Sequence, residues 1–441
     1  MKQEKKGSYG LMVLITGFAL FASYFGAGNV MFPPIEGLAS GSAWLSSILG
    51  LTSSGIFLPI LAIIIIGRKG SVTAITGHVH SQCYNVIVGA IMLIVIFSAN
   101  PRTAALAIET GIQGSFPNVP YIPCVIIYFM IVFLASRTKG KALDNVGKYL
   151  TPALVAILLA LIVTAFAKPI ATPIDTGLEK PFVHAFLTGY NTGDVLGSFL
   201  FANVFLATIE SKGYKGKERS KVIFYAAIIA FVGLLIVYGG LLYMGACGSA
   251  IFPANTGRAE LLVGLVKLVG GRFALMGIGL AIILACLTTA ITQATAAADF
   301  FVDLSKGRWS YHITLAVICI LSTIITFIGV DNIVVFSNPI YNTIYPILIA
   351  ILLLAVFEKY IPNDGAWKGA ILLTAVYSVI EAVCLAGAEI GALQSIVDAM
   401  PMSKYGFGWF CPCVVGFVAG VFLYRKHTVE SNQTVSQSEE T

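Results

Sequence analysis

Long apolar runs alternate with short polar segments along almost the whole chain. A transmembrane helix needs about 20 mainly apolar residues. Twelve stretches approach that length, with predicted limits 10–35, 43–66, 84–107, 121–136, 147–167, 189–210, 220–246, 273–300, 312–329, 334–356, 367–388 and 407–424. The pattern predicts an all-α polytopic membrane protein with a single transmembrane domain over 1–424.

Composition supports this prediction. Of the 441 residues 57% are hydrophobic and 11% are charged, whereas a soluble domain carries about 25% charged residues. The basic N-terminus continues into an apolar run that is too long for a removable signal peptide, so we expect a retained first helix. The polar tail, 425–441, is predicted to be disordered.

The lysines and arginines are distributed unevenly between the loops. With the N-terminus in the cytoplasm, 20 of the 27 fall on the cytoplasmic side, six fall in outer loops and Arg102 lies within the third span. Cytoplasmic loops carry the excess of positive charge, so both termini are expected in the cytoplasm. Topology thereby accounts for the net charge of +6, and nucleic acid is not expected as a partner.

The first span is interrupted in its middle by "FGAGN", residues 25–29. Unwinding at glycines frees carbonyls before the break, which suit a cation, and amides after it, which suit a carboxylate. A broken helix persists in a membrane only where it is buried in protein or lines a cavity. The alternative is a close-packing face of small residues. We expect Pro33 and Pro34 to mark the end of the outer half-helix and Glu36 to lie outside the substrate site.

The sixth span contains "GYNTGDVLGSFLFANVF", residues 189–205, with three glycines four residues apart. That spacing also fits a helix-packing face. Spans 1 and 6, however, begin two sets of five spans with opposite directions, and interrupted helices at corresponding places in inverted halves mark a transporter site. We therefore predict inverted repeats over about 10–167 and 189–356 and two peripheral helices within 367–424.

The eighth span places two threonines, Thr288 and Thr289, side by side in an apolar run. Threonines in membrane helices often donate to their own helix carbonyls, which is the structural explanation. Two hydroxyls opposite freed carbonyls would instead form an oxygen cage, which is the ligand set that hard cations prefer.

Three other ionisable residues lie within apolar runs: Arg102, Glu109 and Glu381. Such residues are functional candidates, but we expect Arg102 and Glu109 near the outer end of span 3 in structural roles. The sequence shows no nucleophile–base constellation and no phosphate loop, so an enzyme is not expected.

The sequences "GFALFASYFGAGNVMFPP", "NPRTAALAIETGI", "GYNTGDVLGSFLFANV" and "LACLTTA" together resemble the bacterial branched-chain amino acid:cation symporter family. The resemblance covers Gly17 to about Tyr424. It implies the leucine-transporter fold of the amino acid–polyamine–organocation superfamily, with inverted five-helix repeats and broken helices 1 and 6. It also implies Na⁺ as the coupling ion and no organic cofactor.

The resemblance assigns site residues. It implies that Na⁺ is held by the carbonyls of Ala22, Phe25 and Ala285 and by the hydroxyls of Thr288 and Thr289. It implies that the substrate carboxylate binds at the first break, to the amides of Gly26, Ala27 and Gly28. The ammonium group is expected at the second break, at carbonyls placed at Phe201, Ala202 and Asn203. Asn29 matches an asparagine that serves a second Na⁺ in some relatives. The chain departs from the family in one respect here: a glycine is expected after Phe201, whereas this sequence has Ala202 followed by the polar Asn203.

Together with the two breaks and the threonine pair, the resemblance implies a Na⁺-coupled symporter that imports leucine, isoleucine and valine across the bacterial cytoplasmic membrane by alternating access. The two breaks are expected to hold the zwitterion without buried charged side chains. A proton-coupled carrier of neutral amino acids is the alternative; such relatives place a span 5 lysine at the sodium position, where this chain offers only Lys148. A channel or a non-transporting receptor fits less well, because the polar breaks are isolated. Substrate ranking, stoichiometry and oligomeric state stay open.

Overall fold

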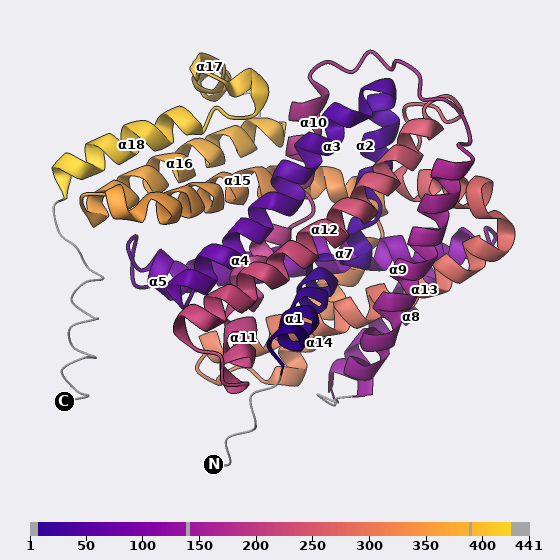
Figure 1. Ribbon diagram of the computed structural model, residues 1–441, viewed down its shortest axis with the longest axis horizontal. Coiled ribbons are helices and arrows are strands. Elements are labelled where there is room, and N and C mark those ends of the chain that lie inside the picture. The colour runs from indigo at the N-terminus through magenta and orange to yellow at the C-terminus, as the bar shows by residue number, and fades with distance from the viewer. Residues whose placement is uncertain (1–7, 138–141, 388–389, 425–441) are drawn as a thin grey trace.

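The computed structural model describes residues 8–137, 142–387 and 390–424, and these residues form helices and connecting turns without a strand (Figure 1). The polar tail predicted to be disordered lies outside the described residues. The helices up to the first long loop are α1 (Tyr9–Tyr24), α2 (Phe32–Ser40), α3 (Trp44–Thr52), α4 (Leu58–Lys69), α5 (Thr73–Thr76), α6 (Cys83–Ile94), α7 (Asn100–Leu106), α8 (Tyr121–Arg137) and α9 (Ala142–Ala167). Those that follow are α10 (Pro181–Tyr190), α11 (Asp194–Ser211), α12 (Gly216–Gly248), α13 (Arg258–Leu304), α14 (Tyr311–Thr326), α15 (Val330–Phe357), α16 (Asp364–Leu385), α17 (Gly391–Ala399) and α18 (Phe410–Leu423).

Each of the twelve predicted spans contains a helix of the structure, which confirms the all-α membrane fold. Within the described residues, seven helices or runs of joined helices are long and apolar enough to cross a membrane, and five further apolar helices are shorter. The largest difference concerns α13, which begins well before the predicted start at 273. Its backbone leaves the helical region at Gly271, with φ 71°, so that two helices meet there and only the second corresponds to the predicted span.

The first span is broken as predicted. α1 ends at Tyr24, a single turn of 3-10 helix, η1 (Ala27–Asn29), follows, and α2 begins at Phe32. The expectation for the two prolines is wrong: Pro33 and Pro34 lie in the first turn of α2 and begin the outer half-helix. Proline fits there because the first amides of a helix have no internal carbonyl partner to lose.

The sixth span is also broken, but the predicted place is wrong. α10 ends at Tyr190 and α11 begins at Asp194, with Gly193 between them at φ 76°. Residues 201–203, where the break was expected, lie inside the continuous helix α11. A positive φ suits glycine, and Gly193 is the member of the glycine series that adopts it.

Close packing holds the outer half-helix α2 against α12. A Cβ atom on Gly37 would lie 1.9 Å from the carbonyl oxygen of Leu242, and one on Gly245 would lie 2.0 Å from that of Pro34. Small residues permit such close approach of membrane helices. At the other side of the molecule α16 and α18 lie side by side and meet in the same way through Gly369 and Gly416 (Figure 1).

Candidate functional site

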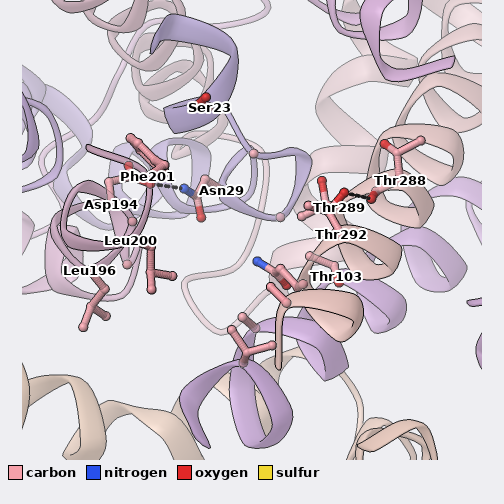
Figure 2. A pocket seen from close by; sticks show the side chains of 18 of the residues that line it. Ser23, Asn29, Thr103, Asp194, Leu196, Leu200, Phe201, Thr288, Thr289 and Thr292 are labelled. Carbon is pink, nitrogen blue, oxygen red and sulfur yellow. Dashed lines mark hydrogen bonds between the residues drawn. The ribbon is translucent and has the colours of Figure 1, made fainter. Parts of the chain in front are cut away.

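A cavity of about 930 Å³ lies between the two helix breaks and α13 (Figure 2). At one end its walls include the exposed residues Ser23, Val204 and Thr292, whereas at the breaks Asn29 and Arg102 are buried. The cavity is therefore open beside the last turn of α1 and the C-terminal halves of α11 and α13, and it is closed at the level of the breaks. A volume of this size accommodates a small-molecule ligand.

Two carbonyls at the end of α1 lose the amides that a continued helix would give them. The amide of Gly26, the helical partner of the Ala22 carbonyl, donates instead to the carbonyl of Tyr24 at 2.8 Å. The amide of Asn29, the helical partner of the Phe25 carbonyl, donates instead to Gly26 at 2.9 Å. Ala22 and Phe25 both line the cavity, so their carbonyls lie where the break was expected to free acceptors.

Ala285, Thr288 and Thr289 line the same cavity from α13, and Figure 2 shows the threonines across from the break in α1. Both hydroxyls donate to the Ala285 carbonyl, at 3.0 Å for Thr288 and 2.8 Å for Thr289. Such bonds to carbonyls of the same helix are the structural explanation that the sequence left open for the two threonines. A hydroxyl that donates its proton keeps lone pairs that can accept or coordinate, so these bonds and a cation site are compatible.

Of the three amides predicted to bind the substrate carboxylate, one already donates a hydrogen bond within the protein. The amide of Gly26 bonds to Tyr24, while Ala27 and Gly28 belong to η1. Gly26 and Gly28 line the cavity. A Cβ atom on Gly28 would lie 3.0 Å from Cγ2 of Thr103, so η1 is packed closely against α7.

Only one of the three residues predicted at the second break lies at the cavity. Phe201 lines the cavity, but Ala202 and Asn203 do not. The side-chain oxygen of Asn203 accepts from the amide of Val72 at 3.3 Å, which ties α11 to the segment after α4. The residues of the actual break that line the cavity are Thr192, Gly193 and Asp194. The turn-forming sequence "NTG" was the signal for this position.

Arg102, Asn29 and Asp194 form a buried hydrogen-bonded chain that joins three elements. Arg102, on α7, donates from Nη2 to Oδ1 of Asn29 at 3.3 Å, and from Nη1 to the carbonyl of Asn191 at 2.5 Å. Nδ2 of Asn29 donates to Oδ1 of Asp194 at 3.0 Å (Figure 2). Because a guanidinium only donates and an ionised carboxylate only accepts, the network fixes the orientation of the Asn29 amide.

Two expectations fail at this network. Arg102 does not lie near the outer end of its helix, because the helical path runs on through η5 (Ala107–Gln113). Nor is the site free of buried charged side chains, since Arg102 and Asp194 line the cavity at 4% and 6% exposure. Glu109, by contrast, accepts from the amide of Val330 at 2.8 Å at the start of α15, which is a structural role. Glu381 lies on α16 and does not line the cavity.

Glu36 lies outside the cavity and holds α2 and α10 together. Its side chain is 1% exposed. It accepts from Oγ1 of Thr188 at 2.9 Å, and its Oε1 lies 2.9 Å from Nδ1 of His184. His184 and Thr188 belong to α10, so Glu36 connects α2 with the first half of the second broken helix.

Two broken helices that face one cavity within an all-helical membrane domain define a membrane transporter of the leucine-transporter fold and not an enzyme. MhsT, solved in complex with L-phenylalanine, superposes on the chain with a TM-score of 0.55 at 15% identity, over 95% of this chain and 100% of MhsT.

The family model "Branched-chain amino acid transport protein" matches residues 10–427, and the chain belongs to that family. It is 31% identical over 428 residues to the branched-chain amino acid permease BraB of Bacillus subtilis, covering 93% of this chain and 95% of that protein. It is 30% identical over 438 residues to the permease BrnQ of the same organism, covering 96% and 98%.

Proposed function

We propose that this protein is a Na⁺-coupled symporter that imports leucine, isoleucine and valine by alternating access. The observation that carries the proposal is the convergence of the Ala22 and Phe25 carbonyls with Ala285, Thr288 and Thr289 on one cavity. Oxygen ligands from uncharged groups suit a hard cation. The relatives named as branched-chain amino acid permeases support the substrate class.

The coupling follows from where the cation would bind. A Na⁺ held between the end of α1 and α13 favours the conformations in which these helices are close, and a ligand shifts such an equilibrium only by its differential affinity. Substrate bound at η1, directly after the α1 carbonyls, then binds more tightly in the same conformations. The coupling is reciprocal, so substrate raises the affinity for Na⁺ as well.

With the N-terminus in the cytoplasm, the open end of the cavity faces the cell interior. The conformation described here is then the inward-facing one, in which the network at the breaks closes the outer path. In this proposal the protein resides in the bacterial cytoplasmic membrane, with both termini in the cytoplasm.

A proton-coupled carrier remains the second candidate because Asp194 places a buried carboxylate on the cavity wall. A buried ionisable group in a transporter is a candidate proton carrier. The lysine on which this alternative rested, Lys148, lies among residues whose side chains are outside the described part of the chain.

Competition measures the substrate class directly. Uptake of labelled leucine into cells that express the protein should be inhibited by unlabelled isoleucine and valine at similar concentrations, and poorly by alanine, lysine and glutamate. Equal inhibition by alanine would contradict a branched-chain preference, and absence of leucine uptake would contradict the substrate assignment altogether.

A further inference from the structure

Asp194 carries a buried carboxylate oxygen without a hydrogen-bond partner among the described residues. Its Oδ1 accepts from Asn29, whereas Oδ2 has no partner there. The side chain is 6% exposed and lines the cavity. An unpaired buried polar group is costly and calls for an explanation, and a ligand that donates hydrogen bonds supplies one.

The position of Asp194 matches the shape of an α-amino acid. The ammonium and carboxylate groups of such a molecule are attached to the same carbon, so their binding groups must be neighbours. Asn29 ends η1 and lines the cavity together with Gly28, and its side chain donates directly to Asp194 at 3.0 Å. The acceptor at the second break and the donors at the first break are therefore adjacent.

Arg102 and Asn29 stabilise negative charge on Asp194. The guanidinium polarises the Asn29 amide, whose NH₂ group donates to the carboxylate. Hydrogen bonds to ionised groups are stronger than neutral ones. The guanidinium is itself held by the Asn191 carbonyl and lies 5.1 Å from the ring centre of Phe32, so that the chain of contacts is fixed at both ends.

We propose that Oδ2 of Asp194 accepts the ammonium group of the substrate, and that Arg102 and Asn29 are positioning residues that hold this carboxylate in place. This assignment rests on the proposed function as an amino acid carrier. It replaces the helix carbonyls at residues 201–203 as the ammonium site. It also gives the site a basis for rejecting carboxylic acids of the same shape, because such a ligand leaves the buried carboxylate unpaired.

The test compares three ligands as competitors of labelled leucine bound to the purified full-length protein in Na⁺-containing buffer. The ligands are leucine, leucinamide, which keeps the ammonium group, and 4-methylpentanoate, which is leucine without its amino group. We expect Asp194→Asn to weaken leucine and leucinamide about 10- to 100-fold and not to weaken 4-methylpentanoate, because the variant has no unpaired carboxylate that would disfavour this acid. Asp194→Glu should keep the preference for the amino ligands. Glu109→Gln, which neutralises a half-buried carboxylate on the same helical path as Arg102, should match the wild type.

Three results would overturn the assignment: equal weakening of all three ligands by Asp194→Asn, unchanged leucine affinity in that variant, or a change confined to the Na⁺ concentration required. The first would indicate a structural role and the last a cation site. If the wild-type protein binds leucine and Asp194→Asn keeps full discrimination, this assignment alone fails. If the wild-type protein binds no branched-chain amino acid, the proposed function fails and the assignment falls with it.

Discussion

His184 of α10 places its Nδ1 atom 2.9 Å from Oε1 of Glu36 on α2. The contact joins one half-helix of each broken segment, on the side of the breaks away from the cavity opening. Glu36 is 1% exposed while the His184 side chain is 48% exposed, so the histidine can exchange protons with solvent from the rim of the protein.

This contact predicts a dependence of stability on pH. The hydrogen bond to the Glu36 carboxylate raises the pKa of His184 above its ordinary value, and partial burial opposes that shift. A group whose pKa is raised in the folded state increases the free energy of unfolding, and for a histidine this increase is complete below its ordinary pKa of about 6.5. The increase is lost as pH rises through the raised pKa. We therefore expect Tm to fall as pH rises above about 6.5 in the wild type, and to fall less in His184→Gln, as measured by thermal unfolding in detergent. The same pH dependence in both proteins would show that the pair contributes nothing, and His312→Gln serves as the control.

The threonine pair on α13 predicts a specific loss of sodium activation. Thr288→Ala with Thr289→Ala removes two of the proposed ligands but leaves the Ala285 carbonyl. We expect the Na⁺ concentration for half-maximal leucine uptake to rise at least about tenfold at equal membrane levels. Thr292→Ala, one turn further along, removes a hydroxyl that donates to the Thr288 carbonyl and should leave sodium activation unchanged. If the double variant is activated by Na⁺ like the wild type, those two residues do not form the cation site.

The contact between Gly28 and Thr103 predicts a loss of transport that a second substitution restores. Gly28→Ala places a methyl group 3.0 Å from Cγ2 of Thr103, and overpacking of this kind costs about 1–3 kcal/mol. The added methyl displaces η1 from α7, so leucine uptake should fall. Thr103→Ser removes Cγ2 but keeps the hydroxyl that donates to Asn100, and the double variant should regain uptake. Equal activity of the single and double Gly28 variants would contradict this steric explanation.

The packing of α2 on α12 predicts a folding defect rather than a functional one. Gly245→Ala directs a Cβ atom to within 2.0 Å of the Pro34 carbonyl oxygen, and backbone atoms cannot move aside as a flexible side chain can. We expect a lower Tm and a lower yield of monodisperse protein on size-exclusion chromatography. The matched control is Gly277→Ala, whose nearest neighbour would be 3.9 Å away. Similar behaviour of the two variants would mean that α2 does not pack as described.

The first break was predictable from the sequence because local chemistry determines it. Glycines at 26 and 28 and prolines at 33 and 34 disfavour a continuous helix in any environment. The threonines of α13 were found for a similar reason, since two adjacent hydroxyls stand out in an apolar run. The prediction that they lie opposite the α1 carbonyls came from the family resemblance and not from their spacing.

The second break and the charged network were not predictable in the same way. The glycines of span 6 recur every four residues, and nothing local shows that Gly193 alone takes a positive φ. Arg102 was placed near a helix end because the apolar run weakens after it, although the helical path continues to Gln113. Its contacts with Asn29 and Asn191 join segments 73 and 89 residues away in the sequence, which a single sequence does not reveal.

Uptake by the purified protein in sealed liposomes distinguishes Na⁺ coupling from proton coupling. Labelled leucine is added outside with either an inward Na⁺ gradient or an inward proton gradient, and the internal concentration is followed with time. If transport is coupled to Na⁺, leucine accumulates above the external concentration under the Na⁺ gradient, and this accumulation is abolished when Na⁺ is equal on both sides. Accumulation under the proton gradient, with none under the Na⁺ gradient, would contradict Na⁺ coupling and would favour the proton-coupled alternative.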